Sequence, residues 1–301
     1  MLFVSGRMVR DRRKWPRHLA GPWLAYVIAV LLTAALQLPV ATSGVLAADY
    51  QGTLRIGGTG AAVATITQVA DAFQKKHPEV RFVFPPSLGS SGGIKAVIAG
   101  ALDVGLNSRP LTEAERSHGL LSTEYARTPL LLVTSHRGAG INFTLKQIAS
   151  IYDGEIQRYP DGIPLRVIMR PEVEIDIHLV RGLSPEIDAA IQRAQLREGM
   201  AVAVTDHDNA EMLLKTRGAL GWMTMAQLIS ENLGLTPLSI NHIVPDQANF
   251  ASGKYPLFRT FSVVTGAHPT PLVKAFLEFL FSAEGRAILV RNSHFLDLKQ
   301  P

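Results

Sequence analysis

Short β-rich segments alternate with helical patterns from residue 53 onward, and this alternation constrains the fold more than any other feature of the sequence. The segment 61–78 has the apolar spacing of a helix that ends at Pro78, and a second helix is expected to run to about Ala99. Segments typical of strands surround these two helices: TLRIGG (53–58), VRFVF (80–84) and DVGLNS (103–108). This order predicts a parallel sheet with helices packed on its faces.

The rest of the chain continues the alternation, with two longer apolar strands expected at 128–136 and 257–265. Thr144 and Gln147 have the spacing of a capping box, and Gly154 suits the end of the helix that they begin. The other expected helices are 184–199, 205–216 and 270–290, and the other strands are 163–170, 218–224 and 235–240. Helix starts are indicated by Thr205 with Asp208, and by Thr270 before Pro271. The chain is therefore expected to belong to the α/β class.

The N-terminal segment has the composition of a secretory signal peptide. Residues 1–18 carry six Lys and Arg against one Asp, an apolar run follows at 24–36, and small side chains come next, with Val45 and Ala47 before the expected cleavage after Ala47. The apolar run is short for a transmembrane span of about 20 residues. Residues 1–47 are thus predicted to be a cleavable leader, with an uncleaved membrane anchor as the alternative.

Charge and cysteine content describe the part of the chain after the leader. The sequence has 30 Lys and Arg and 25 Asp and Glu, and residues 1–47 contain six and one of these, which leaves 24 of each. The basic character therefore belongs to the leader and gives no reason to expect nucleic-acid binding. Without cysteine, the chain forms no disulfides and cannot carry the lipid of a lipoprotein. A soluble periplasmic protein is expected.

The sequence GSSGG (89–93) has two chemical interpretations. It matches the G-x-S-x-G turn of serine hydrolases, and it also matches a loop of small residues at a helix start, where anions bind. Pro85 and Pro86 separate it from the preceding strand, and no oxyanion loop of the HGGG type is present, so the enzyme interpretation is rejected. The residues His178, Asp206, His207 and Asp208 match no metal-ligand spacing, and the last three suit a polar helix start, so neither a metal nor a cofactor is expected.

The order of these motifs resembles the PstS-like substrate-binding proteins of phosphate-type ABC transporters, from about residue 53 to residue 295. The resemblance is carried by the segments 89–111, 143–159, 170–172, 218–223 and 269–289. It implies a two-lobed periplasmic-binding-protein clamp of type II, with the strands 128–136 and 257–265 as the two crossovers. Lobe 1 would comprise residues 48–134 and 259–301, and lobe 2 residues 135–258. A monomer is implied that binds a small anionic or polar solute between the lobes and delivers it to a permease.

In the first lobe, the resemblance places ligand contacts at three loops. The loop serine of the family matches Ser90, with Ser91 beside it. The family's threonine in the first loop falls on Gly60 or Ala61, next to Thr59. At the end of the third strand, Ser108 takes the place of an Asp and is followed by Arg109. A helix start supplies free N–H groups and a favourable dipole for an anion. A serine cap and a solvated loop arginine are the alternatives for these positions.

The second lobe departs from the family pattern R-x-x-G-S-G-T. Arg170 is retained, but the four residues that follow the RPE segment are Val173, Glu174, Ile175 and Asp176. Two hydroxyl donors have become carboxylates, which only accept hydrogen bonds when ionised. We therefore predict weak phosphate binding, with Arg170 partly neutralised by Glu174 or Asp176. Favourable first-turn charges on a helix are the alternative role for the two acids. The expected function is periplasmic binding of phosphate, a related oxyanion or another small solute, with an exported sensor or interaction protein as the alternative.

Overall fold

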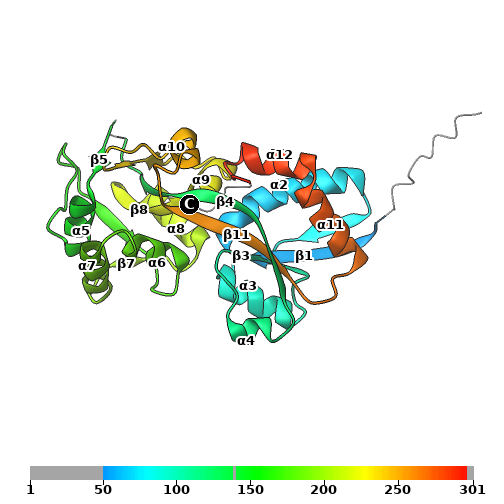
Figure 1. Cartoon of the computed structure of the whole chain (residues 1–301). Helices are drawn as coiled ribbons and strands as arrows, with labels where there is room; N and C mark the ends of the chain where they lie inside the picture. Colours follow the sequence, from blue (N-terminus) through cyan, green and yellow to red (C-terminus); the bar gives the residue numbers. More distant parts are fainter. Residues whose placement is uncertain (1–49, 138–139, 297–301) are drawn as a thin grey trace, which may run out of the picture. The chain divides into compact units, whose positions relative to one another are not determined.

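The computed structural model describes residues 50–137 and 140–296, which lie in a compact unit that begins at Asp49 (Figure 1). The predicted leader, residues 1–47, lies outside the described residues. Among the helices that are described, none combines the length and the apolar character needed to cross a bilayer.

Most strands join one nine-stranded sheet in the order β2-β1-β3-β11-β4-β8-β6-β7, and β9 pairs with β4. Their bounds are β1 (Gly52–Gly58), β2 (Val80–Val83), β3 (Val104–Asn107), β4 (Leu121–Thr134), β6 (Arg166–Met169), β7 (Ala201–Val202), β8 (Ala219–Thr224), β9 (Thr236–Pro237) and β11 (Phe258–Thr265). The strands β5 (Asn142–Phe143) and β10 (Ser239–Ile240) form a small parallel sheet. β1 is parallel to both β2 and β3, so the predicted parallel arrangement of the first strands is confirmed.

Two long strands connect the two ends of the large sheet. β4 pairs with β11 antiparallel through its first part, from Leu121 to Pro129, and with β8 through its last part, from Leu130 to Thr134. β11 also pairs with β3, so the first three strands reach β8, β6 and β7 only through β11 and β4 (Figure 1). β11 matches the crossover strand expected at 257–265, whereas β4 begins at Leu121, seven residues before the expected start at 128. The two-lobed α/β fold with two crossover strands is confirmed.

Several helices begin at the capping residues that the sequence indicates, whereas α2, α3 and α6 begin without a side-chain cap. They are α2 (Gly60–Lys76), α3 (Gly89–Ile98), α4 (Glu113–Arg116), α5 (Leu145–Asp153), α6 (Ile175–Arg181), α7 (Pro185–Gln195), α8 (Asp206–Lys215), α9 (Met225–Ser230), α10 (Gln247–Ala251), α11 (Pro271–Phe281) and α12 (Ala283–Arg291). Thr144 with Gln147 and Thr205 with Asp208 form the predicted capping boxes, and Gly154 ends α5 with φ +78°. These local predictions are confirmed.

Two of the expected elements are divided in the structure, and the short elements α4, α6, α9, α10, β5 and β7 fall outside the predicted helices and strands. The single helix expected at 270–290 is two helices, because Ser282 is extended and its hydroxyl accepts a hydrogen bond from Gly285 N at the start of α12. A Cβ at Gly285 would lie 2.3 Å from the carbonyl oxygen of Phe279, so this tight turn requires glycine. The strand expected at 235–240 is divided between β9 and β10, which belong to different sheets.

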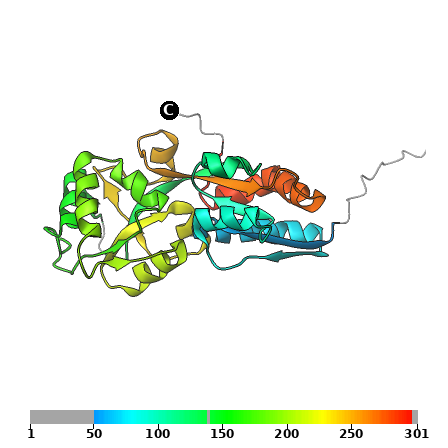
Figure 2. The same ribbon diagram turned by 90° about the horizontal axis from the view of Figure 1, so that it is seen from below.

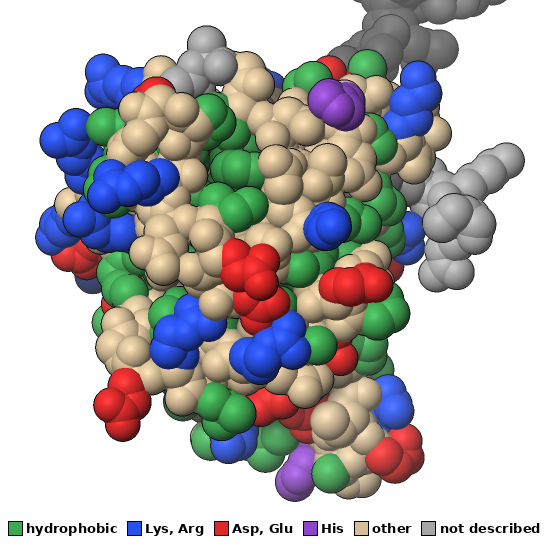
Figure 3. Space-filling model, turned by 90° about the vertical axis from the view of Figure 1, so that its left-hand side faces the viewer, with side chains coloured by type: hydrophobic (Ala, Val, Ile, Leu, Met, Phe, Trp, Pro, Cys, Tyr) green, Lys and Arg blue, Asp and Glu red, His purple; other side chains and the backbone are tan. Residues whose placement is uncertain are grey.

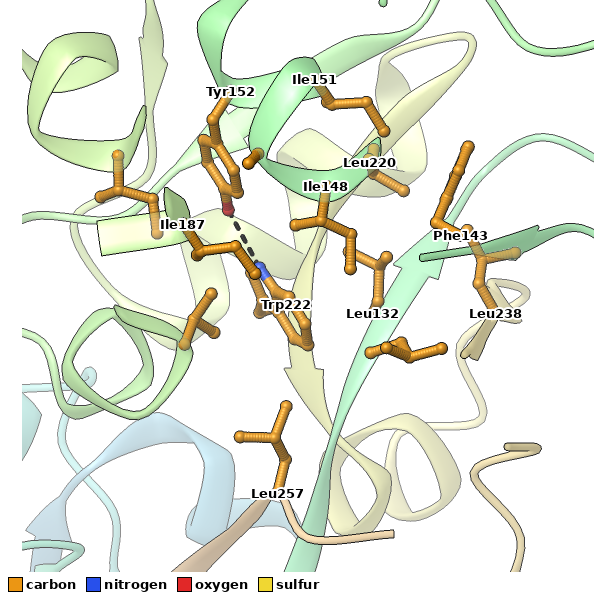
Figure 4. Close-up of a cluster of buried hydrophobic side chains, with 14 of the residues drawn as sticks. Leu132, Phe143, Ile148, Ile151, Tyr152, Ile187, Leu220, Trp222, Leu238 and Leu257 are labelled. Carbon is orange, nitrogen blue, oxygen red and sulfur yellow. Dashed lines mark hydrogen bonds between the residues drawn. The ribbon is translucent and has the colours of Figure 1, made fainter. Parts of the chain in front are cut away.

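Each lobe has a hydrophobic core of its own. Figure 2 shows the green and yellow segments of the chain mostly at one end of the molecule and the blue and orange segments at the other. We call the part built from β1–β3, α2, α3, α11 and α12 the first lobe, and the part built from β5–β8, β10, α5–α8 and α10 the second lobe. In the first lobe, Phe73 packs edge-to-face on Phe276, with ring centroids 5.7 Å apart. In the second lobe, Trp222 lies among aliphatic side chains and its Nε1 donates to the hydroxyl of Tyr152 at 2.9 Å (Figure 4). Two rigid cores thus position the polar residues between them.

Candidate ligand-binding site

The start of α2 holds a carboxylate from the other lobe. Thr59 precedes α2 and is buried, and its Oγ1 donates to Asp206 Oδ2 at 2.8 Å. The backbone N–H of Ala61 donates to the same oxygen at 3.0 Å. The first N–H groups of a helix have no partner within the helix, so this carboxylate satisfies one of them.

Asp206, the first residue of α8, receives two arginines on its other oxygen. Oδ1 accepts from Arg170 Nη2 at 3.2 Å and from Arg259 Nη1 at 3.1 Å. Only 4% of Asp206 is exposed. Burial by itself disfavours the charged form, but the charges of Arg259 and Arg170, with the hydrogen bonds from Thr59 and Ala61, hold the pKa of Asp206 well below its usual range. Asp206 is therefore an ionised carboxylate with two donors on each oxygen.

Arg170 directly follows the last residue of β6, and only 1% of Arg170 is exposed. Its Nη1 donates to the carbonyl oxygen of Ala203 at 3.0 Å and also to that of Thr205. Its Nη2 donates to Glu174 Oε2 at 3.2 Å as well as to Asp206. The guanidinium is held by backbone of its own lobe and is shared between two carboxylates.

Arg259 lies on the crossover strand β11 and connects the two lobes. Its Nη2 donates to Thr59 Oγ1 at 2.8 Å and to Ser108 Oγ at 2.7 Å, both from the first lobe. Its Nη1 lies 3.2 Å from Asp176 Oδ1, in addition to its contact with Asp206. Burial opposes the charge, but the nearby carboxylates outweigh it and raise the pKa of Arg259 above its usual value.

The two acids of the second-lobe loop have different partners. Glu174 pairs with Arg170, as predicted, but Asp176 pairs with Arg259 and not with Arg170. The reason is that Asp176 lies in the first turn of α6, which contacts β11. Burial raises the pKa of both carboxyl groups, and the arginines offset part of that effect. With all groups ionised, the two arginines and three acids carry one net negative charge.

Ser90 and Ser108 extend this network, whereas Ser91 and Arg109 form a separate one. Ser90 Oγ accepts from Ser108 N at 3.1 Å and lies 3.1 Å from Ser108 Oγ. Ser91 Oγ accepts from Arg109 Nη2 at 3.0 Å, and Arg109 pairs with Glu115 at 2.7 Å. The charge of Arg109 is thus balanced within the first lobe.

We use the name buried cluster for Thr59, Ala61, Ser90, Ser108, Arg170, Glu174, Asp176, Asp206 and Arg259, which these contacts connect. Sequence reasoning placed all of them except Asp206 and Arg259 at the site. Asp206 was interpreted only as part of a polar helix start. The predicted site residues do not include Arg259, which the sequence places in the strand 257–265. A single arginine in an apolar crossover strand is itself a signal of a paired buried charge.

A pocket of about 620 Å³ adjoins the buried cluster. Its wall includes polar groups of Ser108, Arg109 and Arg259 and apolar side chains of Ile175, Leu179 and Phe258. Ile175 lies in the segment 173–176, where the resemblance to the PstS-like family would place Gly-Ser-Gly-Thr. The pocket is therefore large enough for more than a simple oxyanion and combines polar donors with an apolar wall.

The described residues include no group of three or more His, Cys, Asp or Glu placed to hold a metal ion.

The surface at the α5 and α7 end of the second lobe carries charges of both signs. There the side chains of Asp153 and Arg193 pair at 2.7 Å. On the face drawn in Figure 3, basic and acidic side chains lie beside one another among apolar and other groups. That face does not present a field of one sign.

A family model described as a PBP superfamily domain matches residues 45–284. The phosphate-binding protein PstS of Borreliella burgdorferi is 25% identical over 259 residues, covering 83% of this chain and 92% of the relative. The Bacillus subtilis phosphate-binding protein PstS is 22% identical over 254 residues, covering 81% of this chain and 80% of the relative.

Solved structures share the fold. A putative phosphate ABC transporter substrate-binding protein with bound phosphate from Clostridium perfringens aligns with a TM-score of 0.68 and 21% identity, over 82% of this chain and all of that one. A phosphate-binding protein from Stenotrophomonas maltophilia aligns with a TM-score of 0.60 and 11% identity, over 83% of this chain and 91% of that one.

Proposed function

The chain belongs to the PBP superfamily, and from this premise we propose that it is the solute-binding protein of an ABC transporter, exported to the periplasm. The ligand is phosphate, a related oxyanion or another small solute, bound between the lobes beside the buried cluster. The observation that carries the proposal is the convergence of Arg170, Arg259 and the start of α2 on one carboxylate. Donors from both lobes meet there, which is the arrangement that a clamp needs to close on a ligand.

The proposal assigns binding and no chemical step to this site. Ser90, the serine of the hydrolase-like motif, has its described hydrogen bonds with Ser108 and none with a histidine. A nucleophilic serine needs an adjacent general base. The network around Ser90 instead positions donors, which supports a binding role.

The partners follow from this role. We propose that the protein is a monomer and that a permease receives the solute from it. Its first lobe would comprise residues 48–134 and 259–301, and its second lobe residues 135–258.

We further propose that the leader is cleaved after Ala47 and leaves no lipid anchor. Expression in a Gram-negative host should give a periplasmic protein with Ala48 or Asp49 at its N-terminus. Recovery with membranes, still carrying residues 1–47, would contradict export as a free periplasmic protein.

Thermal shift tests the binding role on the purified mature protein, with phosphate, sulfate and a set of small organic solutes. A ligand at about 100 times its Kd adds about 2.7 kcal/mol of stability, which raises Tm by roughly 5–10 °C in a protein of this size. Ile175→Trp, which fills the pocket beside the buried cluster, should abolish the shift. Val173→Trp is the matched control, because Val173 belongs to the same loop and is 84% exposed.

The rewritten loop favours one other function. Glu174 and Asp176 satisfy the arginines internally, which suits an exported sensor or interaction protein with an altered pocket. This candidate predicts that no solute in the screen shifts Tm and that the protein does not associate with a permease. A solute that binds and whose shift Ile175→Trp removes would reject it.

A further inference from the structure

Four donors surround one position between the lobes, which we call the anion position. They are Thr59 Oγ1 and Ala61 N from the first lobe, Arg170 Nη2 from the second lobe and Arg259 Nη1 from the crossover strand. Two guanidinium groups and a helix N-terminus favour negative charge at this position. Asp206 of the protein itself occupies it.

We propose that Asp206 is a tethered anion that occupies the anion position, excludes free oxyanions from it and holds the two lobes together when no solute is bound. This inference deepens the proposed function and rests on it only in placing the solute cleft between these lobes. In this inference, Asp206 is the residue that makes the site selective against inorganic phosphate.

The shape of α2 is adapted to this carboxylate. A Cβ at Gly60 would lie 3.1 Å from Asp206 Cβ and 2.9 Å from Ser87 Oγ. Any larger residue at position 60 would push against the stem of Asp206, so glycine permits its close approach to the first turn of α2. The resemblance to the phosphate-binding family placed a threonine hydroxyl at residue 60 or 61, where this chain has no hydroxyl.

Attachment to α8 gives Asp206 an advantage over a free anion. A group that is held within the same molecule competes at an effective concentration in the millimolar range. Asp206 also loses little freedom on binding, because Thr205 caps α8 and Gln227 Nε2 donates to the backbone carbonyl of Asp206 at 3.2 Å. A free phosphate must displace a carboxylate that is already aligned with four donors.

Glu174 and Asp176 do not share this role. Glu174 contacts Arg170 alone, and Asp176 contacts Arg259 alone, among the buried cluster. Within the described part of the chain, neither carboxylate hydrogen-bonds to the start of α2, whereas Asp206 accepts from Thr59 Oγ1 and Ala61 N there. Asp206 and Asp176 both bring negative charge to the buried cluster, but only Asp206 occupies the anion position. Comparing variants of these two acids therefore separates the effect of charge on phosphate binding from the effect of occupying that position.

The experiment compares Asp206→Ala with Asp176→Asn and with Glu211→Gln, an exposed acid on the same helix as Asp206. Phosphate binding is measured by calorimetric titration at low salt, with chloride at equal ionic strength as the reference. Asp206→Ala is expected to bind phosphate at least about tenfold more tightly than the unmodified protein, because four donors are released. Asp176→Asn should gain no more than about threefold, since it changes only a neighbouring charge. Glu211→Gln should match the unmodified protein.

Amide hydrogen exchange of Ala61 gives a second measurement, which does not depend on affinity. Without phosphate, this N–H should exchange slowly in the unmodified protein and rapidly in Asp206→Ala. Adding phosphate to Asp206→Ala should slow its exchange again. If Asp206→Ala fails to fold without phosphate, its recovery by phosphate but not by chloride supports the proposal. Asp206→Asn, which keeps the size of the side chain, then provides the titration.

Two results would overturn the inference. One is an equal gain in phosphate affinity for Asp206→Ala and Asp176→Asn, which would make Asp206 one acid among several. The other is an Ala61 amide that stays protected in Asp206→Ala without phosphate. Failure of the proposed function is distinguishable, because it would appear as a lack of any solute bound by the unmodified protein, whatever phosphate does to Asp206→Ala.

Discussion

The two sides of the cleft offer an anion very different chemistry. The first lobe contributes neutral groups: the hydroxyl of Thr59 and the backbone N–H of Ala61 donate to Asp206, and the hydroxyl of Ser108 accepts from Arg259. The second lobe contributes ions: Arg170 together with the carboxylates of Glu174, Asp176 and Asp206. The neutral side presents hydrogen-bonding groups without charge, whereas the ionic side carries three carboxylates beside its arginine.

Under the proposed function, this difference explains how the site could keep its neutral donors and differ in ligand from a phosphate-binding protein. Neutral N–H and O–H groups at helix starts donate hydrogen bonds to any oxyanion and need no counter-charge of their own. Buried arginines, in contrast, must be paired, and a protein carboxylate serves as well as a bound ion. Under the proposed function, we therefore expect changes on the ionic side alone to alter selectivity, while the neutral side stays the same.

The largest expected effect is on folding stability and tests the ionic side. Arg259→Met would leave Asp176 and Asp206 buried with one arginine fewer, so we expect a loss of about 3–5 kcal/mol in the free energy of unfolding. Urea unfolding measures it. Arg116→Met is the control, because that exposed arginine pairs with Glu113 on the surface and should cost no more than about 1 kcal/mol. Equal losses would mean that the buried cluster contributes no more than a surface pair.

A smaller effect is expected on binding when the ionic side is made neutral. Restoring Gly-Ser-Gly-Thr at positions 173–176 removes two carboxylates and returns two hydroxyl donors. We expect roughly tenfold tighter phosphate binding at low salt, because each of the two like charges removed contributes about threefold, which corresponds to about 0.7 kcal/mol at a partly screened site. The gain should be incomplete, because Asp206 stays at the anion position.

Calorimetric titration of the loop variant decides this prediction, and Glu172→Ser serves as the control. Glu172 lies next to the loop, is largely exposed and pairs with Arg181, away from the buried cluster. Tight phosphate binding by the unmodified protein that the loop exchange leaves unchanged would show that Glu174 and Asp176 do not oppose an anion.

The smallest effect concerns the neutral side. Ser90→Ala removes the acceptor of the Ser108 N–H and should lower the free energy of unfolding by about 1 kcal/mol. Ser91→Ala is a matched change one residue later, where the hydroxyl accepts only from the exposed side of Arg109, and should cost less than about 0.5 kcal/mol. Chemical unfolding of the pair tests whether the two serines differ. Equal costs would remove the distinction between the buried cluster and the Ser91–Arg109 network.

Local patterns were sufficient for most of the secondary structure. Capping residues such as Thr144 and Thr205 act within three residues of the helix start, and their partners were therefore visible in the sequence. The parallel pairing of β1 with β2 and β3 followed from the strand–helix alternation. The break at Ser282 was missed, because the apolar spacing continues through 270–290 and the close contact of Gly285 with Phe279 is three-dimensional.

The sequence by itself determined the α/β class, the capped starts of α5 and α8, and the two acids at residues 174 and 176 where the resemblance expects hydroxyl donors, because these depend on neighbours along the chain. Only the tertiary structure decided which charges meet. Asp206 lies 147 residues from Thr59 and 53 from Arg259, and Asp176 lies 83 from Arg259. An ion pair depends on the distance between atoms in space, which the folding of two lobes onto crossover strands sets and which spacing along the chain does not record.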